Sequence, residues 1–234
     1  MQYCLIYKSS SIVMVGSIAF MVFIVLSHAG VAQERTISQS EFDKIYQAAG
    51  RLSYSRPVRT TMHSKHLRNI TDDKFVMITE ISEFMDKGTK RIVRTEENPY
   101  QGKTRTETIT IGDDRYERVN DSKWQKHSIS KMINGTGGFT MEELPLRRKE
   151  FTFRCLGRVD FEGKATELYE SRMLREYEGQ PAYTSIERIW IQPDGTMLRT
   201  ESKTVESNGR VTFEMEVDFE YPKDLAIKPP SEVN

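Results

Sequence analysis

The chain has 234 residues and equal numbers of basic and acidic side chains, 34 lysines and arginines against 34 aspartates and glutamates. This balance gives no bulk electrostatic attraction to nucleic acid or to an anionic membrane surface, so we expect neither as a partner. The two cysteines, Cys4 and Cys155, are too few for a framework of several disulfide bridges.

Residues 1–32 predict a cleavable secretory signal peptide. Lys8 provides the positive charge, residues 12–26 form an apolar run, and residues 29–32 are small and suit cleavage after Ala32. No cysteine lies at the cleavage point, so we expect no lipid anchor. The alternative is an uncleaved membrane anchor, because the run extended to Ala32 is about long enough to span a bilayer.

Residues 33–234 are enough for a single domain with a sizeable core. Cys155 is the only cysteine in this part, so it cannot form an intramolecular disulfide. An exported chain of this size without disulfides is typical of a bacterial envelope. We therefore expect a periplasmic protein.

One short amphipathic helix is predicted near the start of this domain. Ser40 can cap it, and apolar residues recur at helical spacing from Phe42 to Ala49. Gly50 then reads as the stop signal. The residues before it, 33–39, read as a polar leader.

From Pro57 onward the sequence predicts strands separated by short turns. The first eight strands fall at residues 58–68, 74–85, 90–97, 105–111, 116–119, 123–127, 151–161 and 164–178. Three more strands lie between Tyr183 and Tyr221. A total of about eleven strands exceeds an ordinary sheet and implies strong curvature or closure. We therefore expect a mainly β (α+β) fold, built on an antiparallel sheet that is strongly curved or closed.

Residues 128–146 interrupt the strands with a glycine-rich insertion that carries apolar residues on both sides. Long loops inside compact domains are usually functional or disordered. We interpret this insertion as a lid or plug.

The last strand alternates large apolar residues from Val211 to Tyr221 with acidic ones, which predicts one buried and one wet face. Asn208-Gly209 before it fits a two-residue type I′ turn. That turn would place Phe213 opposite Thr204, Val217 opposite Thr200, and Val211 opposite Glu206.

The preceding turn, residues 192–196, predicts a three-residue loop with Gly195 in the left-handed region. This loop would place Trp190 opposite Leu198. Trp190, Ile186 and Arg188 would then share the apolar face of the last strand.

On that face, Thr200, Ser202 and Thr204 would lie beside a row of large side chains and leave a groove, which a helix of this chain or a ligand would fill. Arg188 would hold an anionic headgroup or pair with a carboxylate of the plug or helix. The candidate ligand-binding residues are Ile186, Arg188, Trp190, Leu198, Thr200, Phe213, Met215, Val217 and Phe219.

No combination of residues predicts a catalytic, cofactor or metal site. His63 and His66 are three residues apart on a predicted strand, so they face opposite sides and cannot share a metal. Cys155 lies in an apolar strand and reads as an inert buried residue. We therefore expect a protein without cofactor that is not an enzyme.

The C-terminal sequence resembles the outer-membrane lipoprotein-sorting family, which has the LolA/LolB-like fold. The likeness is carried by Ile-Trp-Ile-Gln-Pro-Asp-Gly at 189–195, Leu-Arg at 198–199, Phe-Glu-Tyr-Pro-Lys-Asp-Leu at 219–225 and Ile-Lys-Pro-Pro at 227–230. It implies an incomplete β-barrel whose apolar face is covered by helices. No binding motif of the family is matched.

The resemblance also implies a function. Members of this family carry lipoprotein acyl chains across the periplasm, hold other lipids, or sense envelope stress. We therefore expect a monomeric periplasmic carrier of lipid or acylated lipoprotein. The alternative is an envelope-stress sensor or protein-interaction module that uses the same fold to contact an envelope membrane protein.

Overall fold

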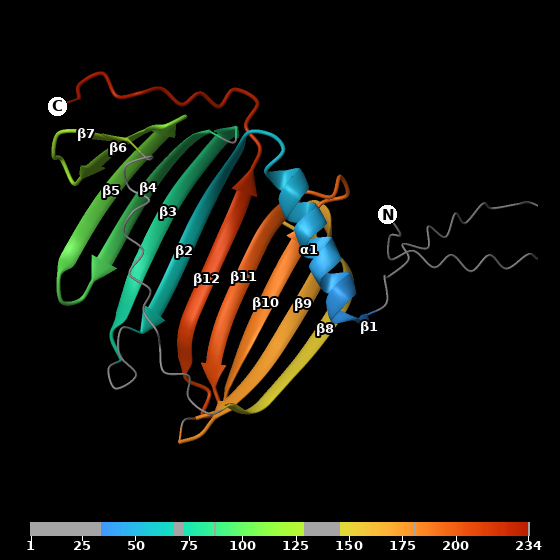
Figure 1. Cartoon of the computed structure of the whole chain (residues 1–234). Helices are drawn as coiled ribbons and strands as arrows, with labels where there is room; N and C mark the ends of the chain where they lie inside the picture. The colour runs from blue at the N-terminus through green and yellow to red at the C-terminus, as the bar shows by residue number, and fades with distance from the viewer. Residues whose placement is uncertain (1–33, 68–72, 87, 129–145, 180, 234) are drawn as a thin grey trace, which may run out of the picture.

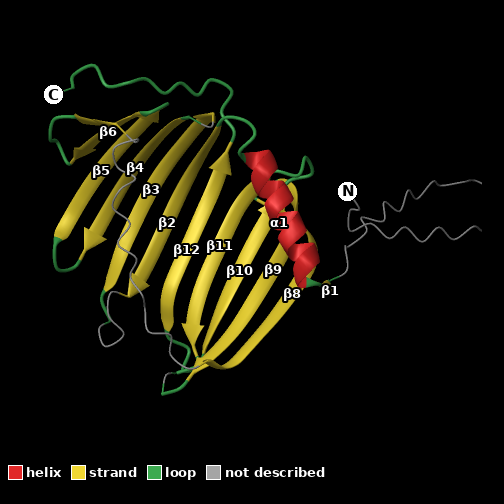
Figure 2. Cartoon of the chain, viewed as in Figure 1, coloured by secondary structure: helices red, strands yellow, loops and turns green. Residues whose placement is uncertain are grey.

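The computed structural model describes residues 34–67, 73–86, 88–128, 146–179 and 181–233. In these residues the chain forms one antiparallel sheet of twelve strands with a single helix lying across it (Figures 1 and 2). The predicted signal peptide and almost all of the predicted lid lie outside the described residues.

The strand order explains how the sheet is assembled. In chain order the elements are β1 (Arg35–Ile37), α1 (Gln39–Ser53), β2 (Val58–Leu67), β3 (Phe75–Asp86), β4 (Thr89–Asn98), β5 (Gly102–Ile111), β6 (Asp114–Val119), β7 (Gln125–Ser128), β8 (Leu146–Phe161), β9 (Lys164–Tyr177), β10 (Tyr183–Ile191), β11 (Met197–Glu206) and β12 (Val211–Glu220). Across the sheet the order is β1-β8-β9-β10-β11-β12-β2-β3-β4-β5-β6-β7. Two meanders, β2–β7 and β8–β12, are thus joined where the last strand pairs with β2.

The predicted fold class is confirmed. All eleven predicted strands are present, and the sheet is an incomplete barrel, because β1 and β7 lie at its two ends and do not pair with each other. The sequence did not predict β1, which lies in the polar leader. This strand has three residues and exists through its pairing with β8, where Ile37 lies opposite Phe153.

Helix α1 begins earlier and ends later than the sequence predicts. Ser38 is the N-cap, and its hydroxyl accepts a hydrogen bond from the backbone N–H of Glu41 at 3.1 Å. Gly50 lies inside the helix rather than at its end. The last turn is held by Ser53, whose hydroxyl accepts from the backbone N–H of Met197 at 2.9 Å. A tertiary contact therefore extends the helix past its local stop signal.

The main core lies between α1 and one face of the sheet, called the helix face below. Phe42 of α1 packs on Phe153 of β8 with ring centroids 5.3 Å apart. The buried members of this core are Ile37, Phe42, Ala49, Val58, Cys155, Tyr169, Ile189, Ile191, Met197 and Phe219. The prediction that Cys155 is buried is confirmed, since it has no exposed surface.

The C-terminal tail forms a second, smaller core with β5 and β6. Ile227 packs against Ile109 and Tyr116, and Val233 forms an isolated bridge with Trp124. In Figure 1 this tail runs along the end of β2–β7. It therefore covers an area of the sheet distant from α1.

Candidate functional site

The predicted register between β11 and β12 is confirmed for most of its length, but the predicted turn is wrong. Phe213 lies opposite Thr204 and Val217 opposite Thr200. The loop has three residues rather than two, because the backbone N–H of Glu206 bonds to the carbonyl of Arg210 at 2.8 Å. A bulge next to Val211 then restores the register, so Val211 lies opposite Val205 and not Glu206.

The placement of β10 is wrong by one residue. The loop before β11 has the predicted form, with a hydrogen bond from the backbone N–H of Gln192 to the carbonyl of Thr196 at 2.8 Å and with Gly195 at φ +84°. A bulge at Leu198 follows, so Trp190 pairs with Arg199 instead of Leu198. A slip of one residue moves every side chain of a strand to the other face.

This slip divides the predicted ligand-binding residues between the two faces. Trp190, Arg188 and Ile186 lie on the face away from α1, called the opposite face below. The residues that share the helix face are Thr200, Phe213, Met215, Val217 and Phe219. Leu198 is the bulged residue and is buried.

With the corrected register, β10 contributes Ile189, Glu187 and Ser185 to the helix face. Beyond the buried core this face carries a band of half-buried residues, mostly small and hydroxylated in its middle and apolar at its sides. We call this band the strip; its members are Ser171, Met173, Ser185, Glu187, Ser202, Thr204, Phe213 and Met215. Sequence reasoning found the β11 and β12 members and missed those of β9 and β10.

Glu187 is the one ionisable residue of the strip. It lies between Ser171 and Ser202 in the cross-strand register, and Ser171 donates a long hydrogen bond of 3.5 Å to its carboxylate. Burial raises the pKa of Glu187, and the Ser171 hydrogen bond lowers it by less. The charge of Glu187 also acts on Tyr46 of α1, since burial and then this charge raise the pKa of the Tyr46 hydroxyl.

Arg188 lies on the opposite face and is paired. Its Nε donates to Glu170 of β9 at 2.9 Å, and Glu170 also accepts from Arg154 and Arg172. Burial alone would raise the pKa of Glu170, but these three arginines outweigh it and lower the pKa to about 2. Arg188 therefore pairs with Glu170 of the neighbouring strand β9 and, within the described residues, not with the helix; the predicted partner in the plug falls outside these residues.

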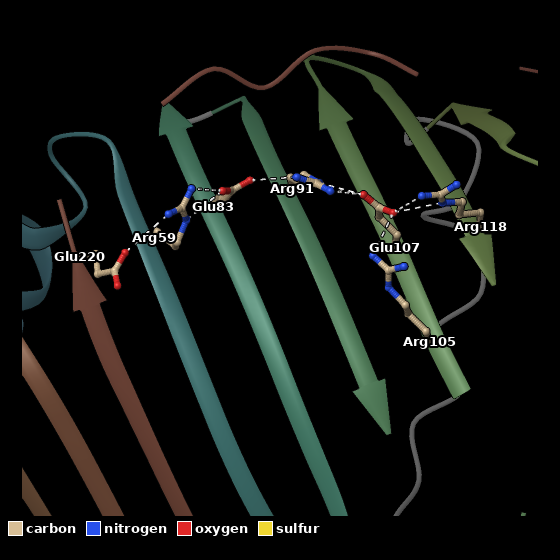
Figure 3. Close-up of polar contacts among 7 residues, drawn as sticks. All are labelled: Arg59, Glu83, Arg91, Arg105, Glu107, Arg118 and Glu220. Atoms are coloured by element: carbon tan, nitrogen blue, oxygen red, sulfur yellow. Dashed lines mark hydrogen bonds and ion pairs between the residues drawn. The ribbon is translucent and has the colours of Figure 1, made fainter. Parts of the chain in front are cut away.

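A second group of ion pairs crosses the opposite face from β12 to β6 (Figure 3). Its members are Glu220, Arg59, Glu83, Arg91, Glu107 and Arg118. Neighbours in this series are directly opposed across adjacent strands, except that Arg91 lies opposite Ile109 and reaches Glu107 diagonally. Glu107 accepts from Arg91 at 2.6 Å and from Arg118 at 2.7 Å. Burial would raise its pKa, but hydrogen bonds from Arg118 and Arg91 outweigh this and lower it. These paired charges link the neighbouring strands from β12 to β6.

The opposite face also has an open depression of about 520 Å³ over β10, β11, β12, β2 and β3. Its lysines, glutamates and arginine all form ion pairs, some with each other and some with Glu170 or Arg199 outside the depression. Glu214, for example, binds Lys65 at 2.5 Å and Lys203 at 2.9 Å. Such a lining does not suit an acyl chain, because burying these ion pairs under hydrocarbon would cost free energy.

Thr200 is a poor position for testing the strip, contrary to what the sequence suggests. It is 8% exposed and lies between Ile189 and Val217 beside the core. Thr200→Trp is expected to overfill this site and to lower the free energy of unfolding by about 1–3 kcal/mol. Denaturant unfolding measures this effect. An unchanged midpoint would mean that the space above Thr200 is open.

The described residues contain neither a side-chain cluster suited to a metal ion nor a helix suited to spanning a membrane. His63 lies opposite Glu216 and His66 opposite Phe213, so the two rings point to different faces. Within the described residues, no group of three or more His, Cys, Asp and Glu side chains could hold a metal ion. No helix found in this part of the chain is long and apolar enough to cross a membrane.

Comparison with known proteins finds similar solved structures at low sequence identity. No family model and no curated protein matches the sequence. LprF from Mycobacterium bovis is similar with 13% identity and a TM-score of 0.47, over 84% of this chain and 99% of that one. The LolA superfamily protein NE2245 from Nitrosomonas europaea is similar with 10% identity and a TM-score of 0.31, over 79% and 94%.

A putative outer membrane lipoprotein-sorting protein domain from Vibrio parahaemolyticus is also similar, with 10% identity and a TM-score of 0.27, over 78% of this chain and 93% of that one. These likenesses identify no site residue.

Proposed function

We propose that this protein is a periplasmic carrier of lipid or lipoprotein acyl chains, and that the strip on the helix face holds the chain. The observation that supports this proposal is the composition of the strip. Ser185, Ser202 and Thr204 of β10 and β11 form a floor of small side chains, with Glu187 beside them, between larger apolar side chains of β9 and β12. Apolar walls with a few polar groups are typical of sites for small apolar ligands.

The walls of the strip come from strands on either side of the floor. Phe213 and Met215 of β12 form one wall, and Met173 of β9 contributes to the other. Adjacent strands are about 4.8 Å apart, so the backbones of β9 and β12 are separated by roughly 14 Å. That separation leaves room for one hydrocarbon chain over Ser185 and Thr204, whose hydroxyls bond to each other at 3.2 Å.

Burial of an acyl chain in this strip would also remove apolar protein surface from water. The wall residues Phe213, Met215 and Met173 are only half-buried in the described structure. Each square ångström of apolar surface that a ligand covers contributes about 25 cal/mol. The proposed role is therefore binding and transfer, with no chemical step.

Ser202→Trp tests the proposal. Ser202 lies in the floor beside Met215, so an indole there is expected to fill the strip and abolish lipid uptake with little loss of stability. Lys203→Trp is the matched control, because this neighbouring residue is exposed on the opposite face. Native mass spectrometry after mild extraction measures bound lipid, and thermal unfolding measures stability.

Two results would contradict the proposal. One is lipid uptake by Ser202→Trp equal to that of the unchanged protein. The other is a purified protein that takes up no lipid of any class. If that protein instead copurified with an envelope membrane protein, the interaction-module alternative would be favoured.

A further inference from the structure

Glu187 is a half-buried carboxylate with no ion pair among the described residues, whereas the buried glutamates there each have two or more. Glu170 is bound by Arg154, Arg172 and Arg188, while Glu107 is bound by Arg91 and Arg118 of its two neighbouring strands. Within the described residues, no lysine, arginine or histidine forms an ion pair with Glu187, and its one hydrogen-bond donor is the Ser171 hydroxyl at 3.5 Å. The structure thus desolvates this carboxylate without compensating it.

Desolvating a carboxylate without a partner costs free energy. A partner for Glu187 would have to arrive on the helix face, because the residue alternates with Arg188, which points to the opposite face. The strip is the part of that face which remains half-buried rather than fully covered. Its occupant is therefore the group that can supply the missing charge.

We propose that Glu187 selects lipids whose polar head carries an ammonium group, with the ammonium on its carboxylate and the acyl chain along the strip. This inference rests on the proposed function. The hydroxyls of Ser171 and Ser202 flank the carboxylate in the register and provide further polar contacts for such a head. An ammonium donor and a carboxylate acceptor form a charge-assisted hydrogen bond, which is stronger than a neutral one.

The same carboxylate disfavours anionic heads. A lipid whose head carries a net negative charge and no ammonium would place two like charges together in a poorly solvated site. Selectivity would then come both from attraction to the ammonium and from repulsion of the anion.

The test compares two lipids with identical acyl chains, phosphatidylethanolamine and phosphatidylglycerol, each carrying a fluorophore at the end of one chain. Binding of each to the purified full chain is measured by fluorescence titration. The unchanged protein is expected to bind phosphatidylethanolamine about tenfold more tightly. Glu187→Gln keeps the shape and the Ser171 contact but removes the charge, so it is expected to bind both lipids with similar affinity.

Glu201→Gln is the matched control. This residue is a half-buried glutamate on the neighbouring strand β11, but it lines the depression on the opposite face. It is expected to keep the tenfold preference. Equal affinity of the unchanged protein for both lipids, or an undiminished preference in Glu187→Gln, would overturn the inference and leave the carrier proposal standing. Absence of binding to either lipid would overturn both.

Discussion

Glu170→Gln is expected to lower the free energy of unfolding at pH 7 by about 3 kcal/mol. The Glu170 side chain is 1% exposed, and it is the shared acceptor for Arg154, Arg172 and Arg188. Removing the charged partner of a buried ion pair typically costs about 3–5 kcal/mol, because the remaining charges are left uncompensated. Denaturant unfolding of the purified protein measures the loss.

The same variant is expected to change the acid unfolding of the protein. Glu170 has a folded-state pKa of about 2, below its ordinary value of 4.5. Its contribution to stability is therefore fully present above about pH 4.5 and is lost as the pH falls toward 2. Glu170→Gln should consequently show a weaker dependence of stability on pH in that window.

Glu150→Gln provides the control for both measurements. Glu150 also binds an arginine, Arg148 at 2.7 Å, but the two side chains are 56% and 54% exposed. Exposed pairs of this kind typically contribute less than about 1 kcal/mol. Equal effects of Glu150→Gln and Glu170→Gln would show that burial does not determine the strength of the Glu170 cluster.

The alternation of apolar and polar residues was enough to predict eleven strands in a strongly curved or closed antiparallel sheet, and the family resemblance implied that the barrel is incomplete. It could not predict β1, because three residues give no measurable period and their pairing with β8 is a long-range contact. It also misplaced the helix cap. Ser38 and Glu41 match a capping box better than Ser40 and Asp43, and the end of the helix depends on the buried contact of Ser53 with Met197.

The face of each strand was harder to predict than the strand itself. In β12 the correct register followed from a wrong turn, because a longer loop and a bulge next to Val211 compensate each other. In β10 the loop was right and the bulge at Leu198 was not foreseen, so Trp190 and Arg188 were assigned to the wrong face. A bulge inserts one residue and has no sequence signature here.

These errors in strand face also decided which candidate site residues could be predicted from the sequence. The β11 and β12 members of the strip were predicted, whereas Glu187 and Ser185 were missed because their face depends on that bulge. The row of ion pairs in Figure 3 was also beyond reach of the sequence, since it requires the pairing of β12 with β2. Features that depend on a bulge, or on pairing between strands far apart in the sequence, could therefore not be predicted from the sequence.

Phe42→Ala is expected to have the largest effect on the core. Phe42 is 4% exposed and joins α1 to the sheet through its contact with Phe153. Loss of a buried phenylalanine side chain typically costs about 3–5 kcal/mol, part of it from the cavity left behind. Because α1 is the helix that covers the core in the described residues, the variant should also expose apolar surface. Denaturant unfolding and binding of a hydrophobic dye measure these two effects.

Leu52→Ala is the control for this prediction, because Leu52 lies on the same helix but is 39% exposed. It is expected to cost less than about 1 kcal/mol and to leave dye binding unchanged, since little buried apolar area is lost. If Phe42→Ala were no more destabilising than Leu52→Ala, the contact with Phe153 would not hold the helix on the sheet. The boundary between the covered core and the open strip would then have to be set by other residues of α1.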